Sequence, residues 1–187
     1  MADLVLGKTL SDSAREYANA TIAALKLPGG VHPPTVVAGC ARMAGTYLFR
    51  SFELKLAGVQ PGQVVLSVEA NEHSPMLLRT AAAILANLGV TISGSPTAAL
   101  INENTRPMHE FLQTQRLLEP LFAPIQIKYN LTMRQAAQGA AIATAILIHQ
   151  LVKHLEPNAG FGLAALAFIE GSKTAPDPVS LPDNVVA

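Results

Sequence analysis

The sequence predicts a mainly α-helical protein, a multi-helix bundle of about five or six helices. Three observations lead to this prediction. Apolar residues recur at helical spacing in most segments, capping patterns precede several of these segments, and glycine or proline follows them. In addition, 50% of the 187 residues are hydrophobic and only 14% are charged, against about 25% charged in ordinary soluble domains. Such a chain has long apolar helix faces to bury.

The first three helices are predicted from signals at their ends. A capping box at residues 13–16 begins the first helix, with Ser11 or Thr9 as alternative caps. Pro34 or Thr35 begins the second helix, and Ser74 caps the third helix ahead of Pro75. Glycine follows each of the three segments, as expected where a helix ends. Within the second helix, small residues favour the close approach of a neighbouring helix: Gly39, Ala41, Ala44 and Gly45.

The last three helices follow in the same way. Pro107 opens the fourth helix, and Glu119-Pro120 ends it because the residue before proline avoids helical geometry. A second capping box, at residues 132–135, begins the fifth helix, and a turn at 157–160 separates it from the last. A short helical turn around 98–101 is a further candidate. The predicted helices therefore span residues 11–26, 34–56, 75–89, 105–118, 132–155 and 161–170.

The remaining segments complete the predicted architecture. Segments rich in β-branched or alternating apolar residues are candidates for a small two- or three-stranded accessory sheet, namely 63–69, 90–92 and 125–129. No composition shift divides the chain, so residues 1–172 are expected to form a single helical domain. Residues 173–187 contain three prolines among polar residues and are expected to be an extended tail.

The composition also excludes several classes of protein. Lys and Arg together number 13, as do Asp and Glu, so we expect no nucleic-acid partner. Disorder requires low hydrophobicity with high net charge, and a disulfide scaffold requires many cysteines, whereas this chain has only Cys40. Residues 1–7 lack the basic start and the apolar run of a secretory signal. We therefore expect a cytoplasmic protein.

The longest uncharged stretch, between Arg134 and Lys153, raises the question of a membrane span. Gln138, His149 and Gln150 interrupt it, and much of the rest is alanine, so we expect burial within the protein instead. Helices that are apolar nearly all round must be covered. The sequence therefore predicts a homo-oligomer, most simply a homodimer.

The candidate catalytic residues are Glu69, Glu72 and His73, which are clustered just before the third helix. Carboxylates and imidazole are the usual general acids and bases, and a helix start favours anions. The alternative interpretation is a solvated capping loop whose acids stabilise the positive end of that helix. His109, beside Glu110, is a further candidate at the start of the fourth helix. No complete set of metal ligands is present, so no metal site is predicted.

Two arginines, Arg42 and Arg50, share one face of the second helix and form a candidate anion site. The alternative is internal pairing, for example of Arg50 with Glu53. His149 is a candidate ligand-binding residue, although a core histidine with a hydrogen bond inside the bundle explains it equally. Cys40 lies among small residues, which favours a buried structural thiol.

Three functional hypotheses follow. The first is a helical protein that acts through homo-oligomerisation or partner binding. The second is a small-molecule binding protein or enzyme with a polar acid/base pocket near residues 69–73 at an oligomer interface. The third is a membrane-associated helical hairpin over residues 132–171. No phosphate-binding loop, dinucleotide fingerprint, zinc motif or nucleophile motif supports a specific chemistry, and no cofactor can be named.

Overall fold

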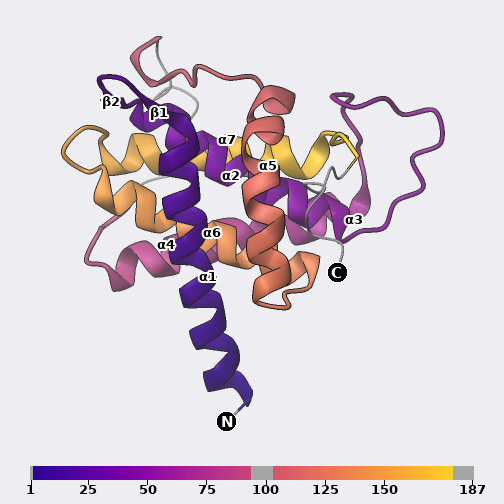
Figure 1. Cartoon of the computed structure of the whole chain (residues 1–187), viewed down its shortest axis with the longest axis horizontal. Helices are drawn as coiled ribbons and strands as arrows, with labels where there is room; N and C mark the ends of the chain where they lie inside the picture. The colour runs from indigo at the N-terminus through magenta and orange to yellow at the C-terminus, as the bar shows by residue number, and fades with distance from the viewer. Residues whose placement is uncertain (1, 94–102, 179–187) are drawn as a thin grey trace.

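Helix α2 (Pro33–Arg50) lies at the centre of the protein, and its residues from Pro34 to Phe49 are all buried. The computed structural model describes residues 2–93 and 103–178 (Figure 1). Two prolines begin α2, where their missing N–H groups cost no hydrogen bond. A helix that is buried all round must present apolar or small residues in every direction, and α2 does so except for two arginines.

The other helices enclose α2. Helix α7 (Pro157–Lys173) and helix α6 (Met133–Gln150) pack along it, and α1 (Ala2–Leu25) and α5 (Phe111–Lys128) run across this layer (Figure 1). The short helix α3 (Val68–His73) leads into α4 (Pro75–Asn87), which packs on α6. A 3-10 turn, η2 (Glu103–Thr105), precedes α5. The predicted mainly α-helical bundle is confirmed.

Helices α2 and α7 touch backbone to backbone. A Cβ atom on Gly45 would come 2.6 Å from the Phe168 carbonyl oxygen and 2.7 Å from the Gly171 Cα atom. Glycine is therefore required at this crossing, because no side chain fits between the two backbones. The close helix approach predicted from the small residues of the second helix is confirmed here.

The accessory sheet is present, but in another place than predicted. Strands β1 (Lys26–Leu27) and β2 (Gly30–Val31) form an antiparallel hairpin about the Pro28-Gly29 turn. The predicted strands 63–69, 90–92 and 125–129 are not strands: the first contributes a single bridge from Val64 to Thr174, then enters α3. The last lies in and just beyond α5. Short apolar runs do not distinguish a strand from a buried helix.

Helix α5 also continues through Pro120 and Pro124, so the predicted end at Glu119 is wrong. Each proline removes one backbone hydrogen bond. Packing outweighs this cost, because Leu118 and Phe122 on the inner side of α5 are fully buried in the core. Tertiary burial has overridden the local propensity at this point.

Several predicted helix ends move by a few residues or more. Helix α1 begins at Ala2, so Ser13 is inside the helix, and its hydroxyl donates to the Leu10 carbonyl oxygen instead of capping. Helix α2 ends at Arg50 and not near residue 56. The capping box of Thr132 with Gln135 is confirmed at the start of α6. The candidate turn at 98–101 lies outside the described residues.

None of the described helices has both the length and the apolar character needed to cross a membrane. Helices α6 and α7 each pack mainly against α2. Residues 132–171 therefore form two helices that both pack against the central helix α2, and they do not form a separate hairpin.

Candidate ligand-binding cleft

Helices α1, α4 and α6 enclose a cleft of about 490 Å³. A volume of roughly 300–1,000 Å³ is typical of small-molecule sites. Helix α1 covers one side because its inner face packs on α6, and α4 packs on α6 from the other side. The cleft is lined by Ser11, Arg15, Ala18, Asn19, Ile84, Asn87, Leu88, Ile142, Ile146, His149 and Gln150.

The lining is divided into an aliphatic part and a polar part. Ile84, Ile142 and Ile146 supply aliphatic surface from α4 and α6. Hydroxyl, amide, imidazole and guanidinium groups supply the polar part, and no carboxylate is among the lining residues. Convergent polar groups beside an aliphatic wall are the usual composition of a ligand site.

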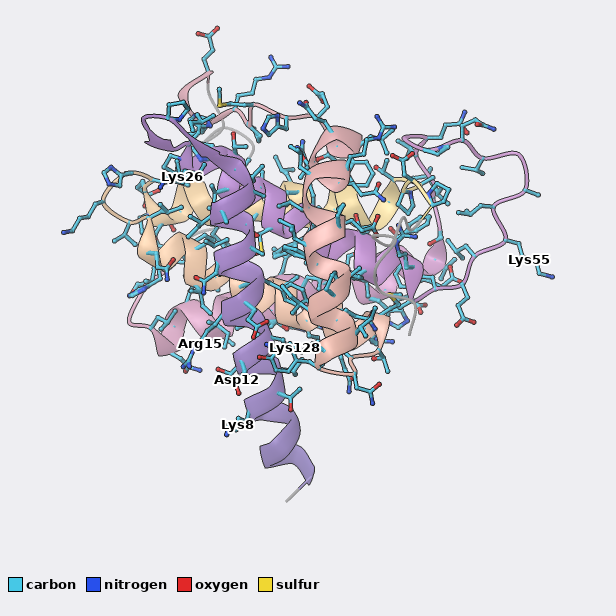
Figure 2. The ribbon with its side chains drawn as sticks, in the orientation of Figure 1. Lys8, Asp12, Arg15, Lys26, Lys55 and Lys128 are labelled. Carbon is cyan, nitrogen blue, oxygen red and sulfur yellow. The ribbon has the colours of Figure 1, made fainter. Side chains whose placement is uncertain are left out.

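Arg15 is the only residue of permanent charge in this lining. The neighbouring residue Glu16 is paired outside the cleft. Its carboxylate lies 2.5 Å from Lys128 Nζ and 2.7 Å from the Tyr129 hydroxyl. These two donors lower the pKa of the Glu16 carboxyl. Arg15 itself forms no ion pair with any residue that the structure describes, and Figure 2 shows its place on α1 beside the body of the protein. Its guanidinium is therefore available to an anion.

His149 also lines the cleft, from the last turn of α6. The expectation of a core histidine with a hydrogen bond inside the bundle is wrong, because His149 is exposed. Periodicity gives the direction of a side chain on its helix but not how far the neighbouring helices extend beside it. Here the inner side of α6 is covered to Ile148, and the exposed residues begin directly after it.

None of the predicted acid/base residues lines this cleft. Glu69 and Glu72 are exposed and lie in helix α3, not in a loop. His73 Nδ1 is 3.0 Å from an Arg134 side-chain nitrogen, and the centroid of its ring lies 6.0 Å from that of Phe52, with the two rings tilted by 32°. No group of three potential metal ligands converges in the part of the chain that the structure describes.

Ser74 differs from its predicted role as well. It stands at the N-cap position of α4 but makes no capping hydrogen bond, because α3 and α4 follow each other almost without a break. Its hydroxyl is 2.5 Å from the Ala70 carbonyl oxygen and 2.7 Å from the Ser172 hydroxyl. Ser74 therefore joins α3 to α7.

The two arginines of α2 are both internally paired. Arg42 Nε is 2.7 Å from a Glu170 carboxylate oxygen, and Arg42 Nη1 donates to the Thr114 hydroxyl and to the His109 carbonyl oxygen. The site residue His109 thus contributes its backbone to the fold. Internal pairing, the alternative to an anion site, describes Arg42 correctly.

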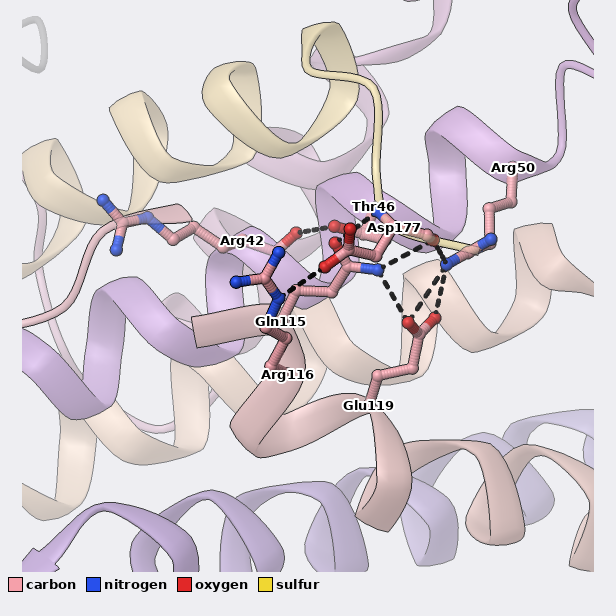
Figure 3. Close-up of polar contacts among 7 residues, drawn as sticks. All are labelled: Arg42, Thr46, Arg50, Gln115, Arg116, Glu119 and Asp177. Carbon is pink, nitrogen blue, oxygen red and sulfur yellow. Dashed lines mark hydrogen bonds and ion pairs between the residues drawn. The ribbon is translucent and has the colours of Figure 1, made fainter. Parts of the chain in front are cut away.

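Arg50 is paired with Glu119 of α5 and not with Glu53. The distances from Arg50 Nη2 to the two carboxylate oxygens are 2.8 and 3.0 Å (Figure 3). Glu53 lies beyond the end of α2, with a left-handed φ of 51°. The sequence could not reveal Glu119 as the partner, because it lies 69 positions away.

The same arginine also holds the segment after α7. Arg50 Nη2 donates to the Asp177 carbonyl oxygen at 2.8 Å. The Gln115 amide donates to that oxygen and accepts from the Asp177 N–H, and Arg116 pairs with the Asp177 carboxylate (Figure 3). A second hollow of about 530 Å³ adjoins this network. Its charged groups are Arg50, Glu53 and Asp177: the arginine and Asp177 are already engaged, and Glu53 adds a negative charge. The α1/α4/α6 cleft, whose lining has no carboxylate, is therefore the better candidate for an anion site.

Cys40 is buried in the core, as predicted, and its thiol lies 3.5 Å from the Ala140 carbonyl oxygen. Burial raises the pKa of the Cys40 thiol to about 11. Burial also raises the pKa values of Tyr17 and Tyr47. The hydroxyls of these two tyrosines are buried without a hydrogen bond in the described structure. All three groups are therefore held in their neutral, unreactive forms.

The free energy of unfolding is expected to fall between pH 9 and pH 11. The unfolded chain loses the Cys40 proton from about pH 9, whereas the folded chain retains it to about pH 11, so ionisation favours unfolding by about 2–3 kcal/mol. Urea unfolding at a series of pH values measures this loss. The variant Cys40→Ala should retain only the part of the loss due to tyrosine, which begins near pH 10. A thiol reagent that labels native Cys40 as fast as the unfolded chain would contradict the assignment.

The fold and the cleft define the class of protein: it is helical, with a buried central helix and an amphipathic cleft. In that cleft the positive charge of Arg15 has no ion-pair partner among the described residues. Comparison with protein-family models, with curated proteins and with solved structures found no match. The function must therefore be argued from the site itself.

Proposed function

We propose that the protein binds a small organic anion with an apolar body in the α1/α4/α6 cleft. The observation that supports this proposal is Arg15, a guanidinium with no ion pair in the described structure, at the edge of a cleft with aliphatic walls. A guanidinium recognises a carboxylate through paired hydrogen bonds. The isoleucines of α4 and α6 suit an aliphatic or aromatic body.

Octanoate tests this proposal, with octanol as the uncharged probe of similar length. Octanoate should bind in a calorimetric titration, and Arg15→Gln should weaken this binding about 10-fold or more, since a hydrogen bond to a charged group contributes about 1.5–3 kcal/mol. Ile146→Trp should abolish binding by filling the cleft. The matched control is Lys8→Gln, an exposed cation on the same helix outside the lining.

The possible outcomes test separately whether the cleft binds apolar ligands and whether it is selective for anions. Equal binding of octanol and octanoate would show that the cleft is apolar without being selective for anions. Binding that survives Ile146→Trp would place the ligand elsewhere. If neither compound binds at millimolar concentration, the proposed function is wrong for ligands of this class.

A second candidate function is self-association, as the composition predicts. It is supported by three large hydrophobic side chains that are exposed in close succession: Val64 is 70% exposed, Leu66 82% and Val68 66%. Monomeric proteins rarely expose contiguous apolar patches larger than roughly a few hundred Å². Light scattering that returned a monomer at all accessible concentrations would contradict this candidate. A cytoplasmic location stays a prediction, with the single free thiol as its support.

A further inference from the structure

Residues 62–66 form an arm that leaves a turn at Gly62 and is extended over residues 63–66. Within the described residues it is paired along one edge only. The Gly62 N–H donates to the Ala175 carbonyl oxygen at 2.7 Å, and the Val65 N–H donates to the Lys173 carbonyl oxygen at 2.7 Å. In return, the Ala175 N–H donates to the Gln63 carbonyl oxygen at 2.9 Å. These bonds make a short antiparallel ladder with residues 173–175, centred on the bridge of Val64 with Thr174.

The outer edge of this arm has no backbone partner in residues 2–93 and 103–178. Alternate residues of an extended chain direct their N–H and C=O groups toward opposite edges. Gln63 and Val65 face residues 173–175, so Val64 and Leu66 face outward. Their backbone groups make no hydrogen bond within the described residues. Unsatisfied groups in such a row can pair with another strand.

The side chains of the arm also favour pairing with another strand. Val64 and Leu66 are exposed, whereas Val65 between them is half-buried, so one face of the arm is apolar and open to solvent. Val68, the first residue of α3, is exposed as well. Exposed edges are usually protected by lysine, proline or a bulge, but residues 63–68 contain no charged residue and no proline. The loop that carries the arm stands out from the helices (Figure 1). It is thus accessible to a partner.

We infer that the arm pairs with the arm of a second copy of this chain, antiparallel about a two-fold axis. This inference rests on the self-association proposed above. The pairing continues an existing ladder, so that residues 173–175 and 62–66 of both copies make one four-stranded sheet. Two uncharged arms bring no like charges together, and Val64 and Leu66 of one copy meet the same residues of the other as cross-strand pairs. The strand predicted over 63–69, which one chain does not complete, then has its partner.

The arm is complementary to itself, which favours a second copy as its partner over a different protein. An isologous interface requires a surface that is complementary to itself. An antiparallel strand edge with alternating apolar side chains meets this requirement, whereas selective binding of a foreign strand would require charges or pockets along the arm. Two strands of about five residues make a small interface, so the dimer should dissociate on dilution.

Sedimentation velocity over a series of protein concentrations tests the inference. Leu66→Pro removes an outward N–H that has no partner among the residues that the structure describes, and it should raise the dimer dissociation constant about 10-fold or more. Leu66→Lys should do the same by placing a charge beside its own copy. The matched control is Leu121→Lys on α5, where a leucine is 41% exposed but no strand edge is present.

The outcomes distinguish the arm from self-association in general. A wild-type dimer that survives both Leu66 variants would show that the protein self-associates through another surface, and the inference would be overturned. A wild-type protein that stays monomeric would overturn the inference together with the second candidate function. A dimer weakened equally by the Leu121 control would also count against the arm.

Single cysteines add a test of geometry. Antiparallel pairing about a two-fold axis through the middle of the arm places one of residues 64, 65 and 66 directly opposite itself, at a separation that a disulfide can bridge. One of Val64→Cys, Val65→Cys and Leu66→Cys should therefore form a linked dimer under mild oxidation. The native Cys40 is buried and does not compete. No linked dimer from any of the three would contradict the pairing.

Discussion

A Gly45→Ala variant is expected to lose about 3 kcal/mol or more of unfolding free energy. The new Cβ atom would lie 2.6 Å from the Phe168 carbonyl oxygen and 2.7 Å from the Gly171 Cα atom. Both atoms belong to the α7 backbone, so relief requires the whole helix to move. Overpacking in cores commonly costs about 1–3 kcal/mol, and contact with backbone lies at the upper end or beyond. Urea unfolding measures the loss.

Two other glycines of the same protein serve as controls. A Cβ atom on Gly39 would meet the end of the Leu25 side chain at 3.0 Å, and a rotamer change can relieve that contact, so Gly39→Ala should cost less. A Cβ atom on Gly7, in α1, would meet no atom within 4 Å other than those of the adjacent helix backbone, and Gly7→Ala should stabilise the protein by about 0.5–1 kcal/mol. A Gly45 variant no less stable than the Gly39 variant would show that α2 and α7 are not fixed in this crossing.

The helical class could be predicted because its signals are local. The capping box at Thr132 and the proline start of α2 depend only on neighbours in the sequence, and both are confirmed. The end of α5 could not be predicted. Pro120 is a strong local stop signal, and it is overridden by the burial of Phe122 and Leu118 against distant segments. The predicted strand at 63–69 failed for a related reason, since a strand needs a partner and the described part of the chain supplies only residues 173–175.

The candidate site was predicted less well, because its residues and their partners come from segments that lie far apart in the sequence. Arg42 and Arg50 were correctly placed on one helix, but their acidic partners come from α7 and α5. His149 was named as a ligand-binding candidate and does line the cleft, although it was also expected to be buried. Arg15 was missed altogether. The available signal was its position on α1, one turn from Ser11 and Asn19, which share its face at i−4 and i+4.

Removal of the Glu119 carboxylate is expected to destabilise the protein by about 3–5 kcal/mol. The side chain of Glu119 is only 4% exposed and that of Arg50 only 14%, so Glu119→Ala leaves a charge buried without its partner. The Gln115 amide, 2.7 Å from the same carboxylate, would lose one of its two acceptors as well, the other being the Asp177 carbonyl oxygen. The segment at Asp177 should also loosen, since Arg50 and Gln115 both donate to its backbone. Urea unfolding and proteolysis near residue 177 measure the two effects.

A double variant and an exposed ion pair show whether the loss comes from an isolated buried charge. Arg50→Met with Glu119→Leu removes both charges and keeps apolar volume, so it should be less destabilising than Glu119→Ala alone. Arg116→Ala breaks a pair whose arginine is 64% exposed, and it should cost less than about 1 kcal/mol. If Glu119→Ala cost no more than Arg116→Ala, water would have to reach Arg50 in the folded protein. Water would then reach the C-terminal end of α2, which α5 and residues 174–178 cover in the structure.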